Sequence, residues 1–486
     1  MSIAKKAVQG VAWNMAIGVS TRVLTLVGQL VIAWYLTPAE VGVVSNALVV
    51  VTMANAFTSF SFGQYLIAKR ASPEVAFQAW AINLGLGVVA LAVVYPLRGP
   101  LGGWFGTPTM GQYVLGYAVG MLIIDRLRYV AERLLMRALR FRALATINGA
   151  GEIAYMAAVL ATIRAWGAYA IVFGFVVRSV VTSVLFLCAA PRAEWLVRTG
   201  LRAADVRSLF TYGMPIMIAI VTDNATKKCD NLVVSTLFGD SVLGSYNQAY
   251  NLADTPISNV AEHIGEVLMP SFSLMEPGQR ERAAIRAASL MGLVVSPFCV
   301  GLGAVAPTAV AALFNASWQA YMPSMLAILS VMFVFRTMTW SVTAYVQAVQ
   351  RTRIVMLSSF FRAVMVLTLV GVCGYLGGPS WACVGGGLGF ALVCVATIIV
   401  AGRVTALPVG AYLRGVARPL LPCVPMYLAV TAVAHGLAAA GVPLLASLVV
   451  QIAVGALVYV AAAFVLVRPG VDELLRLGRE ALRRRR

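Results

Sequence analysis

Residues 30–48, LVIAWYLTPAEVGVVSNAL, decide the fold, because a similar stretch, LVVSTLFGDSVLGSYNQAY, follows at residues 232–250. In this register Gly42 meets Gly244, and Asn46 meets Gln248. Each copy joins two apolar stretches through a short polar turn. The chain is therefore predicted to contain two similar halves.

A second pair of segments extends this repeat. RALRFRALA at residues 137–145 corresponds to VQRTRIVML at residues 349–357, and both are basic elbows after an apolar stretch. The first half and the second half then begin in the same orientation. Parallel repeats of this kind, related by an axis along the membrane normal, are a transporter architecture with the substrate site between the halves. A duplicated channel or scaffold is the alternative.

The composition excludes a water-soluble protein. Of 486 residues, 60% are hydrophobic and only 11% are charged, against roughly 25% charged in soluble domains. A membrane-spanning helix needs about 20 apolar residues, and division at Pro, Gly and charge clusters predicts about fourteen spans. The expected spans are 11–35, 41–67, 78–97, 112–135, 145–163, 166–188, 208–237, 241–270, 286–313, 320–349, 354–376, 379–401, 416–437 and 442–467.

The basic residues orient these spans. The 37 Lys and Arg exceed the 18 Asp and Glu by 19 charges, and cytoplasmic connections are enriched in Lys and Arg. Every second connection is basic, from Lys5 and Lys6 at the N-terminus to Arg483–Arg486 at the C-terminus. The connection after the fourth span, which includes Arg126, is one of them. Both termini are therefore expected in the cytoplasm.

The predicted fold is an all-α polytopic membrane protein with two six-helix lobes, related by a pseudo-two-fold axis along the membrane normal, and two further helices. We expect an N-terminal lobe at 1–190, a C-terminal lobe at 191–403, helices 13 and 14 at 404–467, and a basic cytoplasmic tail at 468–486.

The motifs of common enzymes and cofactor sites are missing from the sequence. The seven cysteines are scattered through apolar stretches, and only two histidines occur. No P-loop, nucleophile elbow, zinc motif or dinucleotide motif stands in a strand–helix context. We expect no enzyme activity, no metal and no cofactor. Nucleic-acid binding is not expected either, because the arginine-ended tail reads as an amphipathic surface helix.

Four stretches carry a resemblance to a known family: AKKAVQGVAWN (4–14), YLTPAEVGVVSNAL (35–48), residues 229–273 from CDNLVV to MPSFS, and residues 296–323 from SPFCVG to AYMP. With them the chain resembles the Wzx-like oligosaccharide flippases, a polysaccharide-transporter group of the multidrug/oligosaccharidyl-lipid/polysaccharide exporter superfamily. The resemblance covers essentially the whole chain. The family's common Arg before the Leu-x-Pro turn is Tyr35 here, so no charge contact carries over to that position.

The resemblance implies a function in surface polysaccharide synthesis, of lipopolysaccharide O-antigen or exopolysaccharide. Such a flippase moves a polyprenyl-diphosphate-linked oligosaccharide from the inner to the outer leaflet of the bacterial inner membrane. It works by alternating access, coupled to H⁺ or Na⁺. Membrane lipids surround it, and polysaccharide polymerase and co-polymerase proteins are expected partners.

Charged and polar residues within the spans are the candidate site, because a charge at the bilayer centre costs about 2.5–3.5 kcal/mol and usually faces a cavity or a partner. Arginine binds phosphate bidentately, so an excess of intramembrane cations suits a lipid diphosphate better than a cationic drug. The candidate ligands for diphosphate or sugar are Arg22, Gln29, Arg178, Lys227, Asn251, Arg336 and Arg362. Arg362 has an alternative role as an ion-pair partner of Glu152.

Three carboxylates are candidates for binding a coupling cation: Asp223, Asp230 and Asp254. Asp223, Lys227 and Asp230 share one helical face by their spacing, so an intrahelical salt-bridge ladder is the alternative. Nearer the cytoplasmic end, a solvated gate is expected from Glu262, His263 and Glu266.

Three other functions remain open from the sequence. A lipid II flippase of the same superfamily would share the architecture, and a cation-coupled multidrug exporter would need a carboxylate-dominated cavity. A membrane glycosyltransferase or ligase would need an outward loop with catalytic carboxylates, and the expected outward loops are short.

Overall fold

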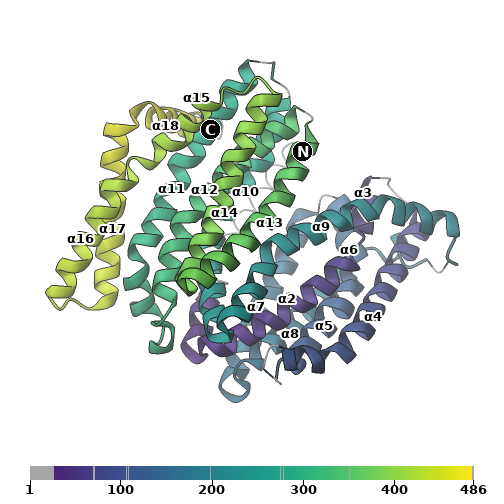
Figure 1. Cartoon of the computed structure of the whole chain (residues 1–486). Coiled ribbons are helices and arrows are strands. Elements are labelled where there is room, and N and C mark those ends of the chain that lie inside the picture. The colour runs from purple at the N-terminus through teal and green to yellow at the C-terminus, as the bar shows by residue number, and fades with distance from the viewer. Residues whose placement is uncertain are drawn as a thin grey trace. The chain divides into compact units, whose positions relative to one another are not determined.

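The computed structural model describes residues 27–68, 72–104, 107, 109–138, 140–197, 199–273, 275–276, 278–349 and 351–483. The chain forms two compact units, Met1–Gly244 and Ser245–Arg486, and the described residues are helices joined by short turns (Figure 1). The units divide at Gly244, one long helix later than the lobe boundary expected at 190/191. The grouping into six-helix lobes stays a prediction.

Unit 1 is a bundle of helices in which α2, α4, α5 and α8 pack around one core. A helical stretch at 27–35 precedes them. The helices are α2 (Pro38–Phe57), α3 (Phe62–Ala68), α4 (Pro73–Trp104), α5 (Met110–Ala118), the π-helix η1 (Val119–Ile124), α6 (Asp125–Arg137), α7 (Phe141–Trp166), α8 (Tyr169–Ala189), the short η2 (Arg192–Glu194) and α9 (Ala203–Phe238). The start of α10 (Asp240–Ser273) closes the unit.

Unit 2 continues from α10 and is centred on α12, which packs against α11 and α14. Its helices are α11 (Gln279–Leu313), η3 (Ala316–Trp318), α12 (Met322–Ala348), α13 (Thr352–Gly377), α14 (Pro379–Val404), α15 (Val409–Ala417), η4 (Arg418–Leu420), α16 (Cys423–Ala439), α17 (Leu444–Leu466) and α18 (Arg468–Arg483). The last long pair, α16 and α17, lies side by side and packs on α11 (Figure 1).

Among the described residues, 11 helices are long and apolar enough to cross a membrane. They correspond to eleven of the expected spans. The helical run from α5 through η1 to α6 covers the expected fourth span, but it carries Asp125, Arg126 and Arg128 within its length. Helix α10 covers the expected eighth span, and most of the first expected span lies outside the described residues. The chain is therefore an all-helical, multi-pass membrane protein.

The turn at Thr37 that starts α2 is stabilised by local chemistry. The Thr37 backbone N–H donates to the Glu40 carboxylate at 2.8 Å, and the Glu40 N–H donates to the Thr37 hydroxyl at 3.4 Å. This is a capping box, which satisfies two backbone donors that a helix start leaves unpaired. Pro38 occupies the first helical turn, where its missing N–H has no consequence.

The two repeated turns contact each other inside unit 1 through their matched glycines. A Cβ atom on Gly42 would lie 1.9 Å from the Asp240 carbonyl oxygen, and a Cβ on Gly244 would lie 1.7 Å from the Pro38 carbonyl oxygen. Asn46 adds polar contacts, donating to the Ser235 hydroxyl at 2.7 Å and to the Asp240 carboxylate at 3.0 Å. Glycine at 42 and 244 therefore permits a backbone approach that any other residue would block.

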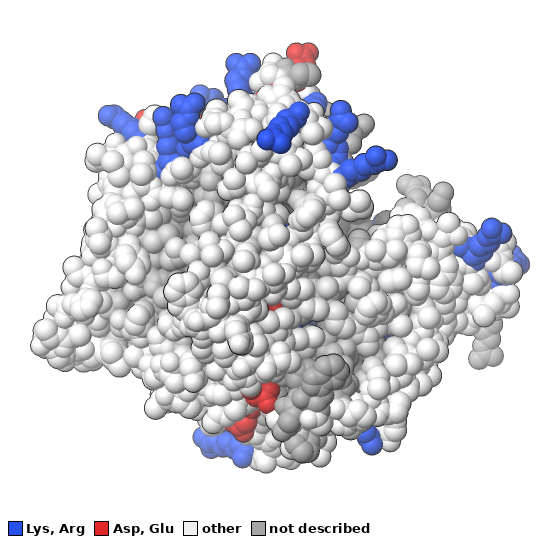
Figure 2. Space-filling view, in the orientation of Figure 1, with Lys and Arg blue, Asp and Glu red and all other residues white. Residues whose placement is uncertain are grey.

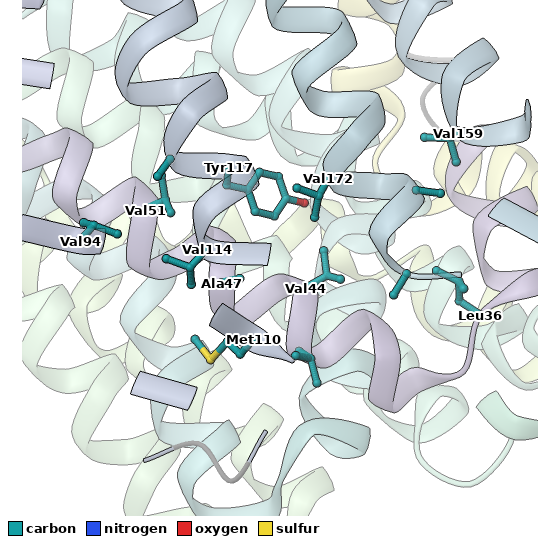
Figure 3. Packing of buried hydrophobic residues seen from close by; sticks show 14 of the residues in the cluster. Leu36, Val44, Ala47, Val51, Val94, Met110, Val114, Tyr117, Val159 and Val172 are labelled. Atoms are coloured by element: carbon teal, nitrogen blue, oxygen red, sulfur yellow. The ribbon is translucent and has the colours of Figure 1, made fainter. Parts of the chain in front are cut away.

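Tyr117 marks the centre of the unit 1 core, which is apolar and closely packed. Its ring extends toward Val172 of α8, while Val44 and Ala47 of α2 lie nearby (Figure 3). Ala47 is fully buried and Val44 is 4% exposed. Such packing couples α2 to α5 and α8, and it holds the turn at the start of α2 in place.

Gly42→Ala is expected to lower the melting temperature of the detergent-purified protein, because forcing extra volume into a packed contact costs about 1–3 kcal/mol. Gly85→Ala is the matched control: a Cβ there meets nothing within 4 Å, and alanine favours a helix by about 1 kcal/mol over glycine. Equal melting temperatures for the two variants would contradict the contact between the turns.

Candidate functional site

Arg336 on α12 is the centre of a polar cluster inside unit 2. Its Nη1 atom donates to the Asp254 carboxylate at 2.6 Å and to the Tyr250 hydroxyl at 3.0 Å. Tyr250 and Asp254 are four residues apart on α10, and side chains at that spacing share one helical face. Two candidate residues, predicted for different roles, are thus brought together as one ion pair.

Aromatic rings from three helices surround the Arg336 guanidinium. Its central carbon lies 5.4 Å from the ring centre of Phe333, 5.7 Å from that of Phe390 and 5.9 Å from that of Tyr250. A cation at this distance from aromatic rings is attracted to their electron-rich faces. Arg336 and Asp254 keep 15% and 24% of their side-chain surface accessible, so the pair is shielded but reachable.

The polar face of α10 continues one turn before this pair. The Asn251 amide donates to the Asn247 side-chain oxygen at 3.2 Å. Carboxamides in this position present donors and acceptors of the kind that bind sugar hydroxyls. The cluster of Asn247, Asn251, Asp254 and Arg336 is therefore the candidate site of unit 2.

In unit 1, Arg178 of α8 pairs with Glu152 of α7 at 2.9 Å. From the sequence, Arg362 had an alternative role as the ion-pair partner of Glu152. In the structure, Glu152 pairs with Arg178. Arg362 instead has its Nη2 atom 3.5 Å from the Ser359 hydroxyl of its own helix. The reason is proximity: α7 and α8 are consecutive, closely packed helices.

Two further candidates in unit 1, Gln29 and Asp230, have enclosed polar groups. The Gln29 side-chain oxygen is enclosed and accepts no hydrogen bond from the residues that the structure describes. Asp230 is 2% exposed, and its carboxylate accepts the Asn231 N–H at 2.9 Å. A buried acceptor without a donor is costly, so Gln29 stays a candidate ligand.

The remaining candidates fall outside the described part of the chain. Arg22 lies outside the described residues, as do the side chains of Asp223, Lys227, Glu262, His263 and Glu266. Their roles, and those of the placed candidates, stay predictions.

Arg126, which was expected in the basic connection after the fourth span, is buried. It is only 4% exposed and lies inside unit 1. Its guanidinium donates to the Asn83 carbonyl at 2.8 Å, the Asn55 side-chain oxygen at 3.0 Å and the Thr58 hydroxyl at 2.5 Å. The sequence carried a signal for this: Val130 and Leu134, one and two turns further on α6, are apolar and buried with it.

The position of the family's missing arginine has a cation after all. Tyr35 stands there, and Arg164 from the end of α7 approaches it, with its Nη2 atom 3.3 Å from the Tyr35 hydroxyl. The guanidinium carbon lies 5.7 Å from the ring centre. The family's own charge contact does not carry over to Tyr35, but a helix distant in sequence supplies a cation beside it.

Replacing only one residue of the Asp254–Arg336 pair is expected to destabilise unit 2 more than replacing both residues. Asp254→Asn or Arg336→Met leaves one shielded charge without its counter-ion, whereas the double variant leaves none. The melting temperature of the double variant in detergent should exceed that of either single variant, with a coupling of about 1–3 kcal/mol. Additive losses would show that the two side chains do not interact.

Arg126→Met is expected to lower the melting temperature substantially, because Asn55, Thr58 and Asn83 then lose their hydrogen-bond donor. Each buried polar group left without a hydrogen bond costs about 1–3 kcal/mol of stability. Arg140→Gln, at an exposed arginine that follows the same helix, is the control and should change little. If both variants have the same melting temperature as the parent protein, Arg126 is not buried as described.

The sequence is similar to that of known polysaccharide biosynthesis proteins. Residues 31–323 match the family described as polysaccharide biosynthesis protein. The lipopolysaccharide biosynthesis protein WzxC of Escherichia coli K12 is 24% identical over 416 residues, covering 84% of this chain and 82% of that protein. The succinoglycan biosynthesis transport protein ExoT of Rhizobium meliloti 1021 is 25% identical over 322 residues, covering 65% of this chain and 64% of that protein.

Solved structures agree on the fold. A lipid II flippase MurJ in an inward closed conformation aligns with a TM-score of 0.75 at 12% identity, covering 94% of this chain and 99% of that one. An inward-facing MATE multidrug resistance transporter aligns with a TM-score of 0.63 at 16% identity, covering 84% and 99%. The chain belongs to the polysaccharide biosynthesis protein family, as a Wzx-like polysaccharide transporter with the fold of the multidrug/oligosaccharidyl-lipid/polysaccharide exporter superfamily.

Proposed function

We propose that this protein is a flippase that carries a polyprenyl-diphosphate-linked oligosaccharide repeat unit from the inner to the outer leaflet of the bacterial cytoplasmic membrane. The unit then serves the assembly of a surface polysaccharide. The relatives support this cargo by their names, which refer to lipopolysaccharide, succinoglycan transport and, for a Bacillus subtilis relative, teichuronic acid biosynthesis.

The observation that carries the proposal is the Arg336–Asp254 pair. A carboxylate and a phosphate are both oxyanions that accept hydrogen bonds from a guanidinium, so a lipid diphosphate that enters the site replaces Asp254 on Arg336. The neighbouring Asn247 and Asn251 supply groups for the first sugar. Aromatic rings around Arg336 exclude water, which strengthens the new contact.

Coupling follows from the displaced carboxylate. Once the diphosphate holds Arg336, Asp254 has lost its counter-ion and takes up H⁺ or Na⁺, which lowers the cost of its burial. When the cargo leaves on the outer side, Asp254 releases the cation and binds Arg336 again. Alternating access then moves one lipid-linked unit per cycle without any covalent step.

The orientation in the membrane is part of the proposal. The alternate basic connections support cytoplasmic termini and an inner-membrane location. A polymerase and a co-polymerase would receive the flipped unit on the outer side. Transport requires no catalytic residue of this chain, so the protein is proposed not to be an enzyme.

Deletion of the gene tests the cargo. Loss of a surface polysaccharide, with accumulation of its lipid-linked repeat unit on the inner leaflet, is the expected result. Cell lysis with accumulated lipid II would instead identify a peptidoglycan-precursor flippase, and increased drug sensitivity with normal polysaccharide would identify a multidrug exporter. Either of these outcomes overturns the proposal.

Complementation of the deletion strain with Arg336→Ala tests the site. Loss of hydrogen bonds to a charged group costs about 1.5–3 kcal/mol, so export per protein molecule should fall about tenfold or more. Arg336→Lys should retain part of the activity. Arg403→Ala, at an exposed arginine on α14, is the control. Normal export by Arg336→Ala at normal protein levels would remove Arg336 from the site.

A further inference from the structure

A basic pocket of about 540 Å³ lies in unit 2, away from the Arg336 site. Four arginines line it: Arg282 and Arg286 from the first turns of α11, Arg414 from α15 and Arg418 from η4. One carboxylate, Glu473 of α18, faces them. The pocket therefore holds three more positive than negative charges. Figure 2 shows Lys and Arg side chains gathered at the end of unit 2 where α15 and α18 lie.

Local contacts keep these guanidinium groups at the pocket. The Arg282 Nε donates to the Gly278 carbonyl at 2.9 Å, and the Arg414 Nε donates to the Gly410 carbonyl at 3.2 Å. Arg286 pairs with Glu473. Within the described part of the chain, no carboxylate lies within 4 Å of Arg282, Arg414 or Arg418. Among the described side chains, Glu473 is therefore the one carboxylate at this pocket.

Close helix packing brings the arginines together from distant parts of the sequence. A Cβ on Gly415 would lie 3.0 Å from the Ile285 side chain, so glycine there permits α15 to lie directly against α11. Arg414 and Arg418 then face Arg282 and Arg286 across the pocket. All four arginines are exposed, so an anion that enters the pocket can reach their guanidinium groups and reduce the repulsion among them.

Most of the remaining wall of the pocket is apolar. Ile285 and Leu290 of α11 line it, together with Leu466 and Val467 at the end of α17. Helix α18 begins directly after them and is amphipathic: Val471 and Leu474 pack on the core of unit 2, while Arg468 and Asp472 stay largely exposed. Helices of this kind lie in the interface between headgroups and acyl chains. The arginines of the pocket suit the phosphate of a phospholipid headgroup, and the apolar side chains beside them suit its acyl chain.

We propose that this pocket binds the phosphate of an anionic phospholipid that resides in the membrane. The phosphate oxygens lie among Arg282, Arg414 and Arg418, and an acyl chain runs along Leu466 and Val467. The lipid is a fixed component of the protein surface and not the transported molecule. The inference stands independently of the cargo, because none of these residues belongs to the Arg336 site.

Binding of phosphatidylglycerol to the full-length protein in phosphatidylcholine nanodiscs tests the proposal, with native mass spectrometry counting the retained lipids. Each basic residue near an anionic headgroup contributes roughly fivefold to affinity. The triple variant Arg282→Gln/Arg414→Gln/Arg418→Gln should therefore bind phosphatidylglycerol about 100-fold more weakly. Phosphatidylcholine retention should not change. The control Arg351→Gln/Arg353→Gln/Arg403→Gln removes three exposed arginines outside the pocket.

Two results would overturn the site itself: an affinity within threefold of the parent protein for the triple variant, or an equal loss for the control. If the triple variant fails to fold, as judged by helical circular dichroism, the single variants Arg414→Gln and Arg418→Gln carry the test with an expected loss of roughly fivefold each.

Competition identifies the source of the phosphate. Inorganic phosphate at millimolar concentration should displace little phosphatidylglycerol, because it cannot use the apolar walls. If it displaces the lipid fully, the pocket is an anion site and the lipid assignment is wrong. If undecaprenyl phosphate displaces the lipid at equal concentration, the pocket belongs to the cargo pathway, which also overturns the proposal. Export by the triple variant reports separately on the flippase function.

Discussion

The low dielectric of the membrane interior imposes the constraint on which the rest of this structure depends: each buried charge needs a partner close by. Arg126 finds its partners in a carbonyl, a carboxamide and a hydroxyl. Arg336 and Arg178 instead bind carboxylates, Asp254 and Glu152. Each arrangement joins neighbouring helices and offsets part of the cost of placing a guanidinium among apolar residues. The guanidinium groups and their polar partners thus connect neighbouring helices, although such groups are unfavourable among apolar residues when unpaired.

The choice of partner decides what each arginine can do. The partners of Arg126 are neutral groups, which have no charge that a cation could neutralise. In the function proposed above, Asp254 takes up a cation when it leaves Arg336, so that the Arg336–Asp254 pair has two states that differ in charge. A transporter needs an interaction of this second kind, since its cargo and its coupling ion must bind in turn. The geometry of unit 2 meets that requirement within a shielded, aromatic surrounding.

The repeated turns show how much of the fold was predictable from the sequence, and why. The matched residues of 30–48 and 232–250, Gly42 with Gly244 among them, predicted two similar connections, since turns depend on neighbouring residues. The spans were predicted for the same reason, because apolar length is a local property. The direct contact between Gly42 and the Asp240 backbone was not predicted. Nothing in the sequence of one turn specifies that the other turn packs on it. The burial of Arg126 was also missed, since clustered charge outweighed the apolar spacing of Val130 and Leu134.

The sequence by itself determined that this is a multi-pass helical membrane protein of a polysaccharide-transporter family, with charged and polar candidate site residues inside its spans. The tertiary structure alone decided which of those charges meet. It joined Asp254 to Arg336, gave Glu152 to Arg178, supplied Arg164 at Tyr35 and gathered four arginines of unit 2 into one pocket. The physical reason is that hydrophobicity acts over consecutive residues, whereas an ion pair forms only between side chains that packing has already brought within a few ångströms.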